Sequence, residues 1–231
     1  MKIFEKELEK FYYKLQEKKP FAFSKYADGE WAVIQGHNVA NGEFDFKKQK
    51  ENEFYREKLI ESFTYKNPEY YVGISCECCQ GQNHFLMKEQ SGQDEEHLTY
   101  ANLFVNTNYP LYVKNFIPEY QNHKIYLVAN EKAKVQNLPF KIEKFYPIGD
   151  TAFIKNYDLI EQIKSENIKD SLFLFCAGPF GNILSHQLFE SNPNNIYMDI
   201  GSTLNPWLQS EGFKRDYYIN GFFAGRRCIW N

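Results

Sequence analysis

The sequence predicts an α/β fold: a single Rossmann-like domain over residues 1–231, with a mostly parallel sheet and helices on both faces. Short apolar runs of strand length alternate along the chain with charged, amphipathic stretches of helix length. Strands that alternate with helices favour βαβ units and therefore a parallel sheet. The 231 residues, which contain no internal repeat, low-complexity stretch or linker, suit one domain with a large core.

The first half of the chain predicts a helix, a strand and a short helix before a turn, and a helix, a strand and a loop after it. Apolar residues at helical spacing among lysines and glutamates predict a first helix, which Pro20 ends. An Asn-Gly pair predicts the turn, a β-rich run predicts the second strand, and the polar residues after that strand predict a mobile loop. In chain order we expect a helix at 2–19, a strand from 21, a short helix at 30–35, the turn at 41–42, a helix at 47–66, a strand at 70–75 and the loop at 85–99.

The second half predicts four further strands and two helices. Asp150 is placed to cap the helix that follows it. A Gly-Pro-Phe-Gly turn after the most apolar strand begins the other helix, whose free N–H groups and dipole would face a phosphate. The expected strands are 124–129, 141–147, 172–176 and 196–200, and the expected helices are 151–165 and 178–188.

Asp28 and Glu30 flank Gly29 directly after the first strand, in the segment FAFSKYADGEWAVIQG. Two carboxylates this close are costly to bury. On an extended turn, both would point into one cleft and share a hard cation, which usually completes its coordination shell with substrate phosphates and water. Alternatively, the pair caps the next helix, with Asp28 accepting helix N–H groups and Glu30 in the first turn. Spacing alone favours the capping role.

The cysteines and the chain end supply further candidates, because ligands of an open α/β sheet bind at the carboxyl ends of its strands. Cys76, Cys78 and Cys79 follow the second strand, but their spacing is not that of paired C-x2-C zinc ligands and a fourth ligand is missing. We therefore expect structural thiols there. Arg226 and Arg227 could bind a diphosphate, although a solvated tail is slightly favoured.

Composition and charge exclude several classes of function. A net charge of −3 provides no overall basic surface for nucleic acid or an anionic membrane. No run approaches the roughly 20 apolar residues that span a bilayer, and residues 1–10 are too charged for a signal peptide. The five cysteines are a poor disulfide framework and fit a reducing compartment. We expect a cytoplasmic protein with no transmembrane segment and no nucleic-acid partner.

Several ordered segments resemble the small glycosyltransferases of the GT-D type, which have a Rossmann-like fold and a D-x-E motif. SKYADGEW resembles the R-[FY]-G-D-G-E segment that opens this family. YPIGDTAF, SLFLFCAGPFGNILSHQL and IYMDIGSTLNPW then follow in the family's order. Three positions depart from the family pattern: Lys25 stands where arginine is usual, Ala27 replaces a glycine, and Ser202 stands where histidine is frequent.

The resemblance implies a glycosyltransferase that moves a sugar from a nucleotide-sugar donor, at family level a UDP-sugar, to a hydroxyl of a glycan or glycoconjugate acceptor. Asp28 and Glu30 would hold Mn²⁺ or Mg²⁺, and a homodimer is a possible assembly. A direct displacement needs a general base for the acceptor hydroxyl, and the candidates are Asp199, Glu77, Asp150 and His97. The expected donor-binding residues are Lys25, Tyr26, Gly29, Asp150, Thr151, Gly178, Pro179, Phe180, Gly181, Arg226 and Arg227.

The sequence leaves two other classes of protein open. A Rossmann-type methyltransferase or other nucleotide-cofactor enzyme would have a Gly-rich turn after the first strand, whereas this turn is acidic and holds a single glycine. A non-catalytic carbohydrate-binding domain would use the abundant aromatic residues, 18% of the chain, together with asparagines. That class predicts sugar binding without a metal and tolerance of Asp28→Asn.

Overall fold

The computed structural model describes residues 2–40, 44–209, 215–218, 221 and 223–230. Within them lies a seven-stranded sheet in which every neighbouring pair is parallel. From edge to edge its strands are β5 (Leu98–Tyr100), β4 (Tyr70–Ile74), β1 (Phe21–Tyr26), β9 (Ile196–Asp199), β8 (Leu172–Cys176), β6 (Ile125–Asn130) and β7 (Lys144–Ile148).

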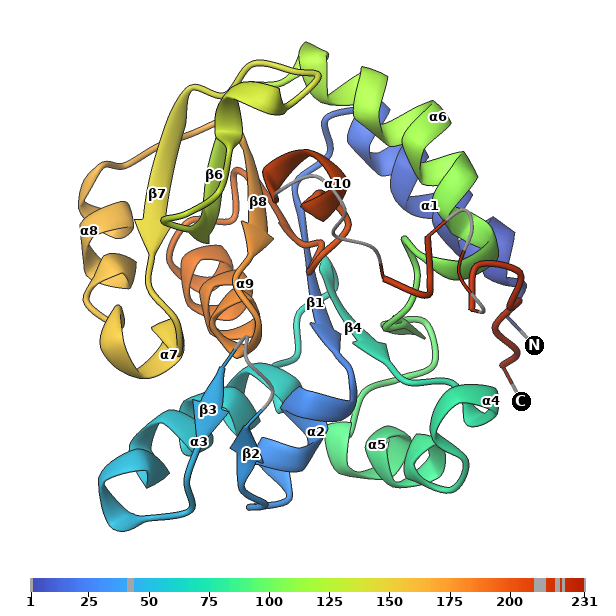
Figure 1. The fold of residues 1–231 in the computed structure, drawn as a ribbon, viewed down its shortest axis with the longest axis vertical. Helices are drawn as coiled ribbons and strands as arrows, with labels where there is room; N and C mark the ends of the chain where they lie inside the picture. The colour runs from blue at the N-terminus through green and yellow to red at the C-terminus, as the bar shows by residue number, and fades with distance from the viewer. Residues whose placement is uncertain (1, 41–43, 210–214, 219–220, 222, 231) are drawn as a thin grey trace.

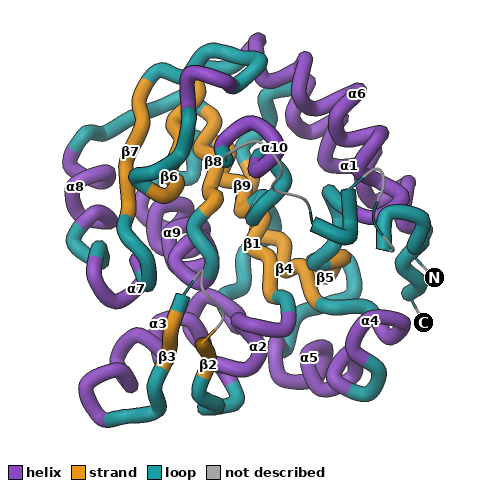
Figure 2. Tube along the Cα trace, in the orientation of Figure 1, coloured by secondary structure: helices purple, strands orange, loops and turns teal. Residues whose placement is uncertain are grey.

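Helices cover both faces of this sheet, whose strands run as a row through the middle of the molecule (Figures 1 and 2). The predicted α/β fold is therefore confirmed. None of the helices in the described ranges combines the length and the apolar character that a membrane span requires. The helices are α1 (Phe4–Gln16), α2 (Asp28–Ile34), α3 (Lys50–Thr64), α4 (Glu77–Gln80), α5 (Asn83–Ser91), α6 (Tyr109–Glu119), α7 (Ala152–Lys155), α8 (Leu159–Ser165), α9 (Pro179–Ser191) and α10 (Asn205–Leu208).

Helices α1 and α6 lie side by side on one face of the sheet (Figure 1). The apolar stripe of α1 turns inward, and the fully buried ring of Phe11 lies 5.6 Å from Phe21 and 5.4 Å from Phe23 on β1, between ring centroids. Tyr12 joins the two helices through the ring of Phe116 at 5.5 Å. Tilted and edge-on aromatic pairs of this kind add to the stabilisation that burial of the rings provides.

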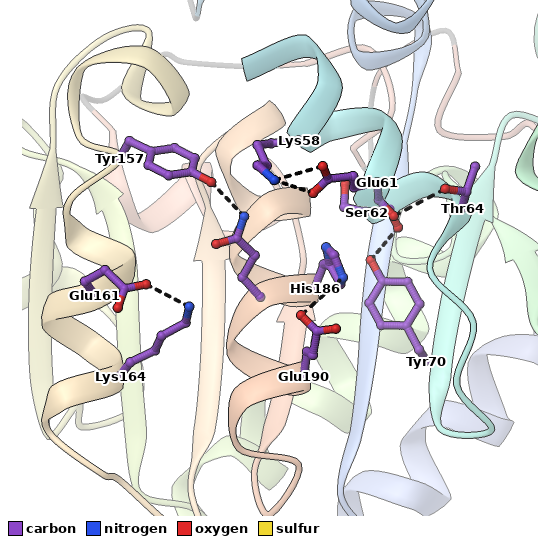
Figure 3. Close-up of polar contacts among 11 residues, drawn as sticks. Lys58, Glu61, Ser62, Thr64, Tyr70, Tyr157, Glu161, Lys164, His186 and Glu190 are labelled. Atoms are coloured by element: carbon purple, nitrogen blue, oxygen red, sulfur yellow. Dashed lines mark hydrogen bonds and ion pairs between the residues drawn. The ribbon is translucent and has the colours of Figure 1, made fainter. Parts of the chain in front are cut away.

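The opposite face is covered by α9, with α3 and α8 on either side of it (Figure 3). Helix α9 is buried on most of its surface because it is enclosed between the sheet and these two helices. Figure 3 also shows exposed polar contacts on the two flanking helices, Lys58 with Glu61 on α3 and Glu161 with Lys164 on α8. We assign them to stabilisation of the helical layer, since exposed ion pairs contribute at most about 1 kcal/mol.

Two sequence expectations about secondary structure are wrong, and a third falls on residues that are not described. Residues 85–99 are not a loop: they contain most of α5, whose buried side chains include Met87, and the start of the edge strand β5. The expected helix 151–165 is divided into two short helices, α7 and α8. The first begins after Thr151, which has a φ of +59° and occupies the capping position expected for Asp150. The Asn41-Gly42 turn lies outside the described residues, between the paired strands β2 (Val39–Ala40) and β3 (Asp45–Phe46).

The chain end is not a solvated tail. Cys228 and Trp230 are each only 2% exposed. The indole ring of Trp230 packs edge-on against His84 at 4.9 Å and against Tyr100 at 5.1 Å, between ring centroids. Burial of one such aromatic side chain is worth about 1.5–3 kcal/mol, so residues 226–230 are part of the packed structure.

Candidate active site

A cavity of about 870 Å³ opens at the carboxyl end of the sheet, the end toward which the arrows of β1 and β7 point in Figure 1. Such a crevice is where open α/β sheets bind their ligands, and the volume is in the range of small-molecule sites, about 300–1,000 Å³. The segment after every strand of the seven-stranded sheet contributes to its lining: 27–30, 79–80, 101–102, 104–106, 130, 132–133, 149–150, 177–178 and 200–203.

The D-x-E motif lies on this lining, but on the first turn of α2 rather than on an extended turn. Glu30 is 6% exposed, and its Oε2 accepts a hydrogen bond from the Ala27 amide at 3.0 Å. Glu30 thus takes the capping role, as in a capping box, while Asp28 stays exposed to the cavity. The expectation that the motif is extended is wrong, because Asp28 and Glu30 are the first and third residues of α2, although both line the cavity.

Lys25 lines the cavity and Asp199 lies buried beneath it, where β1 and β9 lie side by side. The Asp199 carboxylate is 1% exposed and accepts hydrogen bonds from the amides of Gly201 at 3.1 Å and Lys25 at 3.4 Å. Burial raises the pKa of Asp199 to about 7, although the Lys25 charge opposes the rise. Burial lowers the pKa of Lys25, but the charges of Glu30 and Asp199 outweigh it and the net pKa is raised.

Asp150 also lines the cavity, with two partners at and just after the end of β6. Its Oδ1 accepts a hydrogen bond from Asn130 Nδ2 at 2.9 Å, and its Oδ2 lies 3.9 Å from Lys132 Nζ. All three residues line the cavity. Thr151 does not: its hydroxyl accepts a hydrogen bond from the Asp45 amide at 3.1 Å, which fixes β3.

The two arginines of the chain end separate. Arg226 lines the cavity, and its guanidinium donates a hydrogen bond to the Cys78 carbonyl. Arg227 points away and pairs with Glu5 on α1, with Nη2 2.8 Å from Oε2. The expectation that both arginines reach the donor site is therefore wrong for Arg227.

The Gly-Pro-Phe-Gly turn contributes less to the cavity than the sequence predicts. Gly178 lines it with a φ of +53°, but Pro179, Phe180 and Gly181 do not. Pro179 has no amide hydrogen, and the Gly181 amide already donates to the Gly178 carbonyl at 2.8 Å. The amides available to a phosphate at this helix end are correspondingly few.

Three solved structures are similar in shape over nearly the whole chain. One is the domain of unknown function 1792, described as having a distinct glycosyltransferase fold, at a TM-score of 0.62 and 15% identity over 97% of this chain and 90% of that one. A selenomethionine form of the same domain gives 0.62 and 14% over 97% and 89%. A new glycosyltransferase of this domain from Streptococcus sanguinis gives 0.63 and 13% over 97% and 92%.

This chain has a glycosyltransferase fold. The likeness is one of shape at low identity, and no protein-family model and no curated protein sequence matches the chain. This likeness of shape confirms the GT-D-type fold that the SKYADGEW segment and the later motifs predicted. The activity of the chain therefore has to be argued from its own cavity.

The glycosyltransferase fold leaves several of the predicted site residues away from the cavity. Tyr26 is fully buried, and its hydroxyl lies 2.7 Å from Ser62 Oγ on α3. Glu77 does not line the cavity. His97 also lies elsewhere, with Nε2 3.3 Å from the Pro68 carbonyl oxygen. Tyr26, expected to contact the donor, and Glu77 and His97, two of the four candidate general bases, therefore do not reach the cavity.

Other lining residues were missed. Lys132 could have been found by the rule that located Asp150, because it comes two residues after the end of β6. Arg215 and Tyr217 line the cavity from the segment after α10. No local pattern marks them, since their position depends on how the chain folds back over the ends of the strands.

The donor set partly suits a hard divalent cation. Asp28 and Glu30 provide oxygen ligands on the cavity wall, and Mg²⁺ is typically held by one or two carboxylates with phosphates and water. Among the described residues these carboxylates and Asp199 do not form a preassembled cluster of three ligand groups. The residues therefore fit a cation that arrives with a diphosphate rather than one held by a protein cage.

Proposed function

We propose that this protein is a glycosyltransferase that takes a nucleotide-sugar donor, a UDP-sugar, and transfers the sugar to an acceptor hydroxyl. The observation that carries the proposal is the meeting of the D-x-E carboxylates with four cationic side chains in one cavity of a glycosyltransferase fold. These cations are Lys25, Lys132, Arg215 and Arg226. A diphosphate needs both kinds of group, cations for its own charge and carboxylates for the metal that accompanies it.

The residues divide between binding and chemistry as follows. Asp28, with Glu30 beside it, would hold Mn²⁺ or Mg²⁺, and that cation when bound supplies Lewis-acid stabilisation of the leaving diphosphate. Lys25 and Arg226 place positive charge near the same phosphates before the reaction begins. Asp150, alone among the four candidate bases, has an accessible carboxylate on the cavity wall, and we propose that it binds a hydroxyl group there.

Asp199 has a positioning role in this proposal. Its carboxylate lies beneath the cavity and holds the amides of Lys25 and Gly201 in place. It thereby fixes the ends of β1 and β9, from which Lys25 and the following D-x-E turn project. The asparagines at 102, 106, 130 and 205 add amide groups that can both donate to and accept from sugar hydroxyls.

The test is a thermal shift assay with nucleoside diphosphates and nucleotide sugars, with and without Mn²⁺, followed by a transfer assay with the ligand that binds. A ligand of the native state raises its stability by about 2.7 kcal/mol at 100 times its Kd. We expect UDP or a UDP-sugar to raise the melting temperature only with metal.

Asp28→Asn should abolish this shift and lower turnover by roughly 100-fold or more, while the free energy of unfolding changes by less than about 0.5 kcal/mol because Asp28 is exposed. Asp158→Asn, an exposed residue that begins α8 away from the cavity, is the matched control. A shift with S-adenosylmethionine would favour a methyltransferase instead. A shift with a free glycan that persists in Asp28→Asn would favour a carbohydrate-binding domain.

A further inference from the structure

The end of β4 and the end of the chain bring four cysteines together beside the cavity. Cys76, Cys78 and Cys79 lie at the start of α4, and Cys228 arrives from the C-terminal segment. The four Sγ atoms lie within 4.8 Å of one another. The fourth thiol that the sequence did not provide near the C-x-C-C run is thus supplied by a residue far along the chain.

The spacing of the sulfurs fits a single tetrahedral ion. A Zn–S bond of about 2.3 Å requires tetrahedral sulfurs to lie about 3.8 Å apart. The four atoms here are already gathered to within 4.8 Å, and Cys76 Sγ and Cys78 Sγ lie 3.1 Å apart. Only small side-chain rotations would be needed to bring them to the ideal separation, and soft thiolates in a tetrahedral set select zinc over hard cations.

Donors from a second layer of residues support thiolate ligands. Asn102 Nδ2 donates to Cys79 Sγ at 3.5 Å, and Asn106 Nδ2 donates to Cys228 Sγ at 3.4 Å. Amide hydrogen bonds to sulfur and a nearby guanidinium stabilise the negative charge of a metal–thiolate centre, and such partners orient the ligands. Arg226 provides that guanidinium through its hydrogen bond to the Cys78 carbonyl.

We propose that Cys76, Cys78, Cys79 and Cys228 form a structural zinc site that fastens the C-terminal segment to the end of β4. All four positions are filled by protein sulfur, which is the pattern of closed, structural zinc sites. Binding converts four thiols to thiolates and releases their protons, so the site adds binding free energy to folding. Cys76 and Cys228 are 1% and 2% exposed, so the ion is shielded from solvent on that side.

The site also places a cavity residue. Arg226 precedes Cys228 by two positions, and the Arg226 carbonyl accepts a hydrogen bond from the Thr107 amide at 3.2 Å. Cys79 itself lines the cavity. Fastening Cys228 therefore holds the backbone from which the Arg226 guanidinium reaches the cavity wall. The metal site is distinct from the D-x-E motif, and its assignment does not depend on the proposed activity.

The test is the metal content of the full chain, expressed with zinc, purified under reducing conditions and measured by mass spectrometry of its metals. We expect about one zinc per chain in the wild type and in Cys176→Ser, the matched control whose thiol lies outside the cluster. Cys228→Ser and Cys78→Ser should lose most of the zinc. Because Cys78 is only half-buried, we expect Cys78→Ser to fold. It therefore tests the site even if substitution of the buried Cys228 prevents folding.

Cobalt substitution and thiol counting complete the test. Co²⁺ in the zinc-free chain should give the intense absorption of tetrahedral cobalt thiolate in the wild type and Cys176→Ser, and not in Cys228→Ser. A zinc chelator should lower the melting temperature of the wild type and make four additional thiols reactive. A wild-type chain without zinc, with iron in its place, or with the cysteines joined as disulfides would overturn the assignment.

Discussion

Glu30 combines a structural and a chemical role in one carboxylate. Its Oε2 accepts the Ala27 amide and closes the first turn of α2, while its charge faces the cavity. Glutamine keeps the capping bond because its amide oxygen can accept from the same amide. We expect both variants to lose turnover and the favourable charge interaction with Lys25, whereas Glu30→Ala in addition loses about 1 kcal/mol of unfolding free energy from the missing cap. Measuring both variants by thermal melts and turnover separates the two roles; full activity in Glu30→Gln would contradict a chemical role.

Asp199 makes stability depend on pH. Burial raises its pKa to about 7 from an ordinary value of 3.8, so between these two values the folded chain keeps a proton that the unfolded chain releases. Stability therefore falls as the pH rises through this window and levels off above it, and each unit of pKa shift corresponds to about 1.4 kcal/mol.

Asp199→Asn should weaken this dependence because asparagine does not titrate. We expect the melting temperature to fall less between about pH 4.5 and about pH 8 in the variant than in the wild type. Circular dichroism melts at several pH values measure the difference. Parallel curves for the two proteins would show that Asp199 is not the group responsible.

At the scale of elements, the end of β9 sets the path of the Lys25 side chain. Gly201 has a φ of +55°, and a Cβ there would lie 2.7 Å from Lys25 Cε. Gly92 ends α5 with a φ of +61°, and its Cβ would meet nothing closer than Lys66 at 3.8 Å. Both glycines therefore have a left-handed backbone, but only a Cβ at position 201 would force another side chain, that of Lys25, to move.

We expect Gly201→Ala and Gly92→Ala each to lose at least about 1–2 kcal/mol of unfolding free energy from the left-handed conformation. Gly201→Ala should in addition weaken donor binding by roughly tenfold, the worth of one hydrogen bond to a charged group. Chemical unfolding and a binding titration measure the two effects. Equal donor affinity in both variants would remove Lys25 from the proposed binding site.

At the scale of the whole molecule, the two chain ends meet at the edge of the sheet near β5. The Tyr100 hydroxyl donates to the Lys2 carbonyl at 2.7 Å, and Trp230 packs on Tyr100. Truncation of the last residues would therefore unfold this corner as well as remove cations from the cavity. Single substitutions of Arg226 and of Arg227 remove one cation at a time and avoid that ambiguity.

Arg226→Ala should raise the apparent Km for the donor by roughly tenfold, because a guanidinium that faces the diphosphate is lost. Arg227→Ala, which removes only the surface pair with Glu5, should leave the Km unchanged. Steady-state kinetics on the two variants provide the comparison. The same Km in both would place the diphosphate elsewhere in the cavity.

The sequence by itself determined the fold class, most strands of the sheet and the position of the D-x-E motif after β1. These features follow from local rules: apolar runs form buried strands, proline ends a helix, and strand ends of a parallel sheet meet at one edge. The same rules explain why Asp28, Asp150 and Gly178 were expected near one cavity, where they lie.

Only the tertiary structure decided which of the candidate residues reach that cavity and which cysteines meet. Arg226 and Arg227 are neighbours in sequence, yet one faces the cavity and the other pairs with α1. Cys228 joins Cys76 because burial of Trp230 and Cys228 brings the chain end back to β4. Contacts between distant segments depend on how the whole chain packs, and a local sequence pattern does not carry that information.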